Sequence, residues 1–172
     1  AAMWVYTIYT MVDGMFVARG VGTTALAAVN ISMPFINTAF ALGILFAVGA
    51  STKASIYKGQ GDMEKANKVF TVSTVTVFSL ALIVAIAALL NLERLAMMLG
   101  ADETTLPYVK DYLGIIIPFV VCYMTSYNLE VLIKADGYPQ KAIVTTLAGA
   151  ATNIVLDYVF VMVFHWGIKG AA

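Results

Sequence analysis

The chain has 172 residues, of which 61% are hydrophobic and only 12% are charged, and its ten Lys and Arg residues balance ten Asp and Glu residues. Soluble domains carry about 25% charged residues, so this chain has too few charges to cover a water-facing surface, and its mean hydropathy of +0.88 indicates an integral membrane protein. The zero net charge gives no reason to expect a nucleic-acid partner, and the single cysteine, Cys122, excludes a disulfide framework and a cysteine zinc site.

Five apolar stretches approach the roughly 20 residues that a helix needs to cross a bilayer. They lie at residues 1–18, 26–57, 65–90, 106–134 and 140–164. The second stretch is longer than a bilayer is thick, which predicts a tilted helix or one that projects into the cytoplasm. We therefore predict an all-α membrane protein with about five transmembrane helices, the first of them truncated at its start. Residues 1–4 are already apolar without a basic segment before them, so no signal peptide is predicted.

Glycine-containing turns separate these stretches, at residues 19–24, 59–62, 99–102 and 136–139. Asp62 is the predicted N-cap of the third helix. Pro34 and Pro118 fall inside the second and fourth stretches, where each is able to kink a helix. Glu130 and Lys134 are spaced to form an ion pair at the end of the fourth.

Lysine and arginine counts in the short loops predict the orientation, because cytoplasmic loops carry an excess of both. The second-to-third and fourth-to-fifth connections hold six lysines, Lys53, Lys58, Lys65, Lys68, Lys134 and Lys141. The opposite connections hold four basic residues diluted by acids, namely Arg19, Arg94, Lys110 and Lys169. We therefore expect the six-lysine side, and with it the N-terminus, to be cytoplasmic.

Two acidic residues, Asp13 and Asp157, lie inside apolar segments. An Asp at the centre of a membrane helix costs roughly 2.5–3.5 kcal/mol to insert, and such a residue usually faces the protein interior and carries a proton, an ion or a substrate. The alternative is a carboxylate close enough to the interface to reach water. That alternative is stronger for Asp13, which is only six residues before Arg19.

Polar residues share a helix face with each acid. Asn153 and Thr146 lie on the face of Asp157, and Tyr6 and Thr10 lie on the face of Asp13. If both helices run outward, the two acids lie at similar depth and form one polar pocket. The alternative for Asn153 and Thr146 is interhelical hydrogen bonding alone, which we favour for Thr146.

Two carboxyl groups in a pocket of low dielectric constant would titrate as a coupled pair, with at least one pKa raised by desolvation and repulsion. Such a site is able to load and release protons near neutral pH. With the oxygen of Asn153 and a hydroxyl, it is also able to hold Na⁺.

Several sequence blocks resemble the first half of multidrug and toxic-compound extrusion (MATE) transporters. They are VDGMFVARGVG at 12–22, LAAVN at 26–30, VGAS at 48–51, GQGD at 59–62, KADGYP at 134–139, NIVLD at 153–157 and GIKGAA at 167–172. The last block resembles the family's entry into its sixth helix. The resemblance covers nearly the whole chain, and it rests on the order and spacing of the blocks together.

The resemblance implies that residues 1–172 are a partial N-terminal lobe of a twelve-helix transporter made of two six-helix lobes. Such a protein lies in the cell membrane among lipids and exports amphipathic or cationic compounds in exchange for H⁺ or Na⁺, without a cofactor. By motif, the family's cation site falls on Asp13, Asn153 and Asp157, and a fourth-helix polar residue falls on Asn128. Thr10 departs from the Asn that many members carry there. The sixth helix and the C-terminal lobe would lie beyond Ala172, so this chain alone is not expected to transport.

Three other functions compete with drug antiport. A flippase for lipid-linked sugars shares the superfamily architecture, but a cationic intramembrane cavity is expected for it and the sequence places no Arg or Lys inside a span. A membrane scaffold or channel leaves the two acids unexplained. An enzyme is least favoured, because no nucleophile–base pair or metal-ligand set is found in the sequence.

Overall fold

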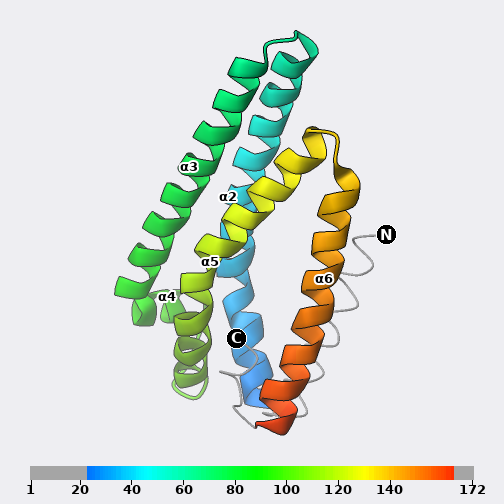
Figure 1. Ribbon diagram of the computed structural model, residues 1–172. Coiled ribbons are helices and arrows are strands. Elements are labelled where there is room, and N and C mark those ends of the chain that lie inside the picture. The colour runs from blue at the N-terminus through cyan, green and yellow to red at the C-terminus, as the bar shows by residue number, and fades with distance from the viewer. Residues whose placement is uncertain (1–22, 165–172) are drawn as a thin grey trace. The chain divides into compact units, whose positions relative to one another are not determined.

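The computed structural model describes residues 23–164, and this part of the chain is helical apart from short turns (Figure 1). Its elements in order are α2 (Thr23–Gly59), α3 (Met63–Leu90), α4 (Leu92–Met98), α5 (Leu106–Ala135), α6 (Pro139–Asp157) and the π-helix η1 (Tyr158–Val163). Four helices among these residues are long and apolar enough to cross a membrane. The predicted all-α membrane fold is confirmed, whereas the predicted first helix, 1–18, lies outside the described residues.

The predicted stretches agree closely with the observed helices. The bounds of α2, α3 and α5 differ from 26–57, 65–90 and 106–134 by at most three residues. Two features were not predicted. The short helix α4 fills part of the third-to-fourth connection, and the last stretch changes at Tyr158 from an α-helix to the wider π-helix η1.

The chain divides into two compact units. Among the described residues, the first unit consists of 23–35, 89–116 and 143–164, and the second consists of 36–88 and 117–142. Pro34 and Pro118 each lie inside a helix, α2 and α5, and each is within two residues of the boundary between the units.

In the second unit, α3 packs through a face of small side chains. This face is buried and consists of Ala66, Ser73, Val77, Ala81, Ala85 and Ala88. Small residues let helix backbones approach closely, which matters in a membrane, where lipid removes the hydrophobic drive for helix association. Gly43 of α2 faces Met124 of α5, and a Cβ atom at this position would lie in van der Waals contact with Cγ of Met124, at 3.6 Å.

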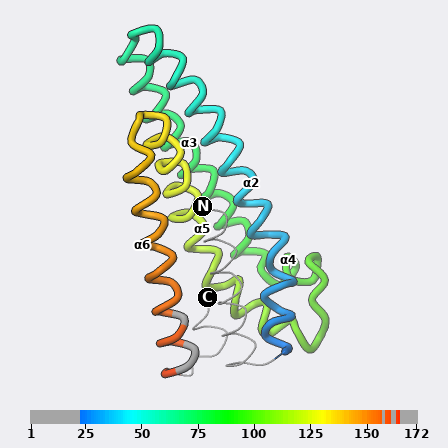
Figure 2. The backbone as a smooth tube through the Cα atoms, turned by 90° about the vertical axis from the view of Figure 1, so that its right-hand side faces the viewer, coloured from blue at the N-terminus to red at the C-terminus, as the bar shows by residue number. Residues whose placement is uncertain are grey.

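Glycine closes both tight turns of the second unit, which Figure 2 shows as the sharp reversals after α2 and α5. Gly61 and Gly137 have φ angles of 78° and 99°, a left-handed conformation that residues with a Cβ rarely adopt. After α2, the amide N–H of Asp62 donates to the carbonyl of Tyr57 (2.9 Å), and after α5 that of Tyr138 donates to Ile133 (3.2 Å). These bonds are the Schellman pattern that satisfies the last carbonyls of a helix.

Ionised side chains at the same end support these turns. Oδ1 of Asp62 accepts a hydrogen bond from the backbone N–H of Lys65 (3.0 Å), so the predicted N-cap is confirmed. The Lys65 ammonium also lowers the pKa of Asp62. Lys58 bonds Asp136 at 2.6 Å and thereby joins the two lysine-bearing connections. The predicted Glu130–Lys134 ion pair forms.

In the first unit, α4 packs against the start of α5. A Cβ atom at Gly114 would lie 3.8 Å from Cδ2 of Leu92, and Lys110 bonds Glu93 at 2.7 Å. The intervening turn is fastened by Asp102, whose Oδ1 accepts from the hydroxyl and the N–H of Thr105 (2.7 and 2.8 Å). These bonds to the ionised form, with one from the Thr104 hydroxyl, lower the pKa of Asp102 to about 2.

Candidate functional site

Asn153, on α6 in the first unit, has an unsatisfied polar atom. Its side-chain oxygen Oδ1 is buried and accepts no hydrogen bond from any residue that the structure describes. Most buried polar side-chain atoms in proteins have a partner, and one without a partner calls for an explanation. The case is stronger in a helix that is long and apolar enough to cross a membrane, because lipid offers no donor in place of water.

The polar side chains near Asn153 on α6 do not satisfy it. The Thr152 hydroxyl is exposed and donates to the carbonyl of Ala148 in its own helix (2.8 Å). Thr146, two turns before Asn153, is also exposed. Among the described residues, the side-chain oxygen of Asn153 therefore stays unsatisfied.

Asp157 is the last residue of α6, one helical turn after Asn153, so the two residues lie on one face of the helix. The π-helix η1 begins at the next residue, Tyr158. π-Helical turns are rare and frequently accompany functional sites, because they shift the register of the residues that follow. The hydropathy pattern gave no signal for this change. Asp13, Tyr6 and Thr10 lie outside the described residues.

Asn128, the predicted polar residue of the fourth membrane helix, has a different environment. It lies on α5 in the second unit and is fully buried. Its Oδ1 accepts a hydrogen bond from the Ser73 hydroxyl of α3 (2.9 Å), and its amide nitrogen donates to the Thr74 hydroxyl (3.4 Å). These bonds join two helices, so the position of Asn128 is explained by helix packing. The structure places Asn128 and Asn153 in different units.

The amide oxygen of Asn153 suits a small hard cation or a protonated carboxyl group. An amide oxygen is an acceptor and a neutral oxygen ligand, and hard cations prefer oxygen ligands. Within residues 23–164, no group of three or more His, Cys, Asp or Glu side chains could hold a metal ion.

A family model described as MatE matches residues 1–159 of the chain. Among curated proteins, the chain is similar to the multidrug export protein MepA of Staphylococcus aureus (strain MRSA252), with 30% identity over 168 residues. The MepA protein of Staphylococcus haemolyticus (strain JCSC1435) shows the same identity over the same length. Each match covers 96% of this chain but only 37% and 36% of the relative.

The solved structures that resemble the chain are also transporters. The chain is similar to an outward-facing multidrug resistance MATE family transporter of the MOP superfamily, with a TM-score of 0.92 and 26% identity. A MOP superfamily transporter from Pyrococcus furiosus, described as having a binding pocket of reverse polarity that suggests a different function, matches with a TM-score of 0.91 and 26% identity. These matches cover 99% of this chain and 38% and 37% of the structures. The chain thus spans little more than a third of the relatives that it matches.

Proposed function

Because this chain belongs to the MatE family, we propose that it is part of the N-terminal lobe of a multidrug antiporter driven by H⁺ or Na⁺. The relatives are named as multidrug export proteins, and this chain spans about 37% of their length. A partial six-helix lobe of a twelve-helix protein would have this length. The complete protein would lie in the cell membrane with its N-terminus in the cytoplasm and would export amphipathic or cationic compounds.

The unsatisfied, buried Oδ1 of Asn153 is the observation that supports ion coupling most directly. We propose that Asn153 and Asp157 on α6, together with Asp13, bind the coupling ion. An amide oxygen that lacks a donor gains a partner when Na⁺ binds or when a neighbouring carboxyl group takes up a proton. The site would therefore favour its loaded state.

Ion uptake would be coupled to drug release through the charge of the two carboxylates. With both carboxylates ionised, the pocket holds two negative charges in a medium of low dielectric constant, and uptake of H⁺ or Na⁺ from outside relieves their repulsion. Loss of that repulsion lets the first helix change its packing, release the drug outside and allow the lobes to close. The membrane potential contributes about 2.3 kcal/mol for each charge that crosses 100 mV.

A flippase for lipid-linked sugars is the nearest alternative. It needs positive charge within the membrane to bind a pyrophosphate. Among the described residues, the lysines of α2 and α3 lie within two turns of the connection between these helices, near its hydrated end. The unsatisfied amide oxygen of Asn153 attracts cations and offers nothing to an anion, which favours the antiporter.

The test is dye efflux from a drug-sensitive bacterium that lacks its own efflux pumps and expresses the full-length protein. We expect the wild type to export a cationic dye and the Asp13→Asn and Asp157→Asn variants to lose export. Dependence on added Na⁺ would identify Na⁺ as the coupling ion. Full efflux by both variants would refute the proposed site, and no export of any cationic dye by the wild type would favour the flippase.

A further inference from the structure

An open groove in the second unit runs between α2 and α3, and its use is not accounted for by ion-coupled export. Its volume is about 710 Å³. Three of its lining residues are lysines, Lys53 of α2 and Lys65 and Lys68 of α3, and no acidic residue lines it. The rest of the lining is mostly apolar or small. The three lysines are half of the six that the sequence places at this end of the molecule.

The lysine ammonium groups are largely available to a ligand. Lys53 and Lys68 are exposed, and neither forms a hydrogen bond or an ion pair with any residue between 23 and 164. Lys65 bonds Asp62 at 2.6 Å, yet 62% of its side chain remains exposed. Asp62 thus neutralises one of the three lysines, and the groove carries an excess of positive charge from Lys53 and Lys68.

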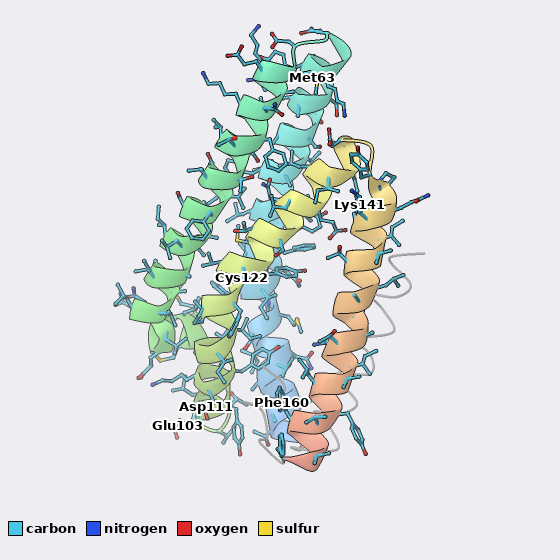
Figure 3. All side chains as sticks on the ribbon, viewed as in Figure 1. Met63, Glu103, Asp111, Cys122, Lys141 and Phe160 are labelled. Carbon is cyan, nitrogen blue, oxygen red and sulfur yellow. The ribbon has the colours of Figure 1, made fainter. Side chains whose placement is uncertain are left out.

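The positions of these groups along α2 and α3 match the layers of a membrane. Met63, labelled in Figure 3, begins α3 at the same end as the three lysines. Leu45 and Phe46 line the other end of the groove and are exposed (66% and 37%). Lys53 is eight residues after Leu45, about 12 Å along the helix axis. The groove is thus cationic near the connection and apolar further along, as the interface and the hydrocarbon core of a bilayer require.

We propose that this groove binds an anionic phospholipid, with the phosphate between Lys53, Lys65 and Lys68 and an acyl chain along Leu45 and Phe46. Basic pockets between membrane helices near the cytoplasmic surface bind anionic headgroups in this way. Long lysine stems also allow the ammonium groups to reach the headgroup layer. Gly49 lines the middle of the groove and leaves room for the chain, because a Cβ atom there would have no neighbour within 4 Å. The proposal depends on the helices crossing a membrane and does not depend on drug export or on the coupling ion.

The chain offers a matched control for the charge. The Lys53→Gln/Lys65→Gln/Lys68→Gln variant removes the three lysines of the groove. The control variant, Lys58→Gln/Lys134→Gln/Lys141→Gln, removes three lysines of the same unit that do not line the groove. Both variants change the net charge equally. A third variant, Gly49→Leu, fills the apolar part of the groove and leaves every charge in place.

The experiment is native mass spectrometry of the full-length protein in detergent, with equimolar dioleoyl phosphatidylglycerol and dioleoyl phosphatidylcholine. We expect the wild type and the control variant to bind phosphatidylglycerol preferentially. Each groove lysine should contribute about fivefold, so the groove variant should lose affinity on the order of a hundredfold. Gly49→Leu should also lose binding, although its charge is unchanged. Circular dichroism and gel filtration show whether each variant is folded.

Three results would overturn the proposal. The first is equal binding of the two lipids to the wild type, as expected if the rest of the protein covers the groove. The second is an equal loss in the groove and control variants, which would indicate a general charge effect. The third is displacement of phosphatidylglycerol by millimolar inorganic phosphate together with normal binding to Gly49→Leu, which would indicate a site for free anions.

Discussion

Two asparagines in apolar helices, Asn153 in the first unit and Asn128 in the second, have opposite environments. The side-chain oxygen of Asn153 is buried without a donor among the described residues, whereas that of Asn128 accepts from Ser73 at 2.9 Å. Placing the amide side chain of Asn in an apolar membrane helix costs the same free energy of desolvation at both positions. The difference shows that a polar residue in an apolar span becomes a functional candidate through its unsatisfied atoms. Its residue type alone does not distinguish a binding site from a packing contact.

The largest effect should follow from Asn153→Ala in the full-length protein. We expect ion-driven efflux to fall on the order of tenfold to hundredfold, as for groups that support a bound metal ion, while the protein remains folded. Dye efflux measures this directly. The neighbouring Thr152→Ala is the control, since that hydroxyl is exposed and donates to the carbonyl of Ala148 in its own helix. An equal loss in Thr152→Ala would mean that α6 is simply sensitive to substitution.

Asn128→Leu should lower the stability of the protein and leave the ion dependence of efflux unchanged. It removes the bonds to Ser73 and Thr74, and interhelical hydrogen bonds in membranes contribute about 0.6 kcal/mol on average and up to about 1.7 kcal/mol. We expect a lower unfolding temperature in detergent and an unchanged dependence of efflux on the coupling ion. A changed ion dependence would place Asn128 in the coupling site and remove the contrast with Asn153.

Ser73→Ala sharpens the comparison within the second unit. It deprives Asn128 of its nearer donor and so gives that residue an unsatisfied oxygen like that of Asn153. We expect a loss of stability of about 1 kcal/mol or less. The same substitution in an Asn128→Leu background should cost less, and unfolding of the four proteins measures this coupling energy. Equal costs in both backgrounds would show that the 2.9 Å bond contributes nothing.

The smallest expected effect concerns Asp102, a polar residue of the first unit whose carboxylate, unlike the oxygen of Asn153, is hydrogen-bonded. Its folded-state pKa of about 2 lies below the ordinary value of 3.8, so the ionised form stabilises the fold. That contribution is complete above about pH 4. It declines as the pH falls towards 2.

Asp102→Asn keeps the acceptor oxygen but removes the charge. It should therefore be less stable than the wild type at neutral pH, and the difference should shrink between pH 4 and pH 2. Thermal unfolding of both proteins across this range checks the sign. A difference that grows as the pH falls would contradict the assigned role of Asp102.

Much of the fold could be predicted from the sequence, because membrane helices need long apolar runs and their ends need glycine. The runs gave the bounds of α2, α3 and α5, and the motifs at 59–62 and 136–139 gave the turns at Gly61 and Gly137. The short helix α4 was missed, since seven residues carry too little periodicity to distinguish a helix from a loop. The π-helix η1 was missed because apolar residues favour it and an α-helix alike.

The candidate site could be predicted only in part. The rarity of acids in membrane helices makes Asp13 and Asp157 candidates, and helical spacing adds Asn153, whose buried oxygen the structure shows to be unsatisfied among the described residues. Spacing cannot show which amide finds hydrogen-bond partners, because Ser73, which donates to Asn128, and Thr74, which accepts from it, are more than fifty residues away in sequence. The lysine-lined groove was also missed, because its residues come from two helices that only the fold brings together. In the sequence, its three lysines served only to predict the membrane orientation.

The most direct measurement is drug uptake by proteoliposomes of the full-length protein, driven by an imposed proton or sodium gradient, for Asn153→Ala beside Asn128→Leu. We predict that Asn128→Leu transports in response to the same gradient as the wild type and that Asn153→Ala fails to respond to either gradient. If Asn153→Ala transports normally, or if Asn128→Leu is the variant that loses its response, the assignment of the coupling site to the unsatisfied amide is wrong.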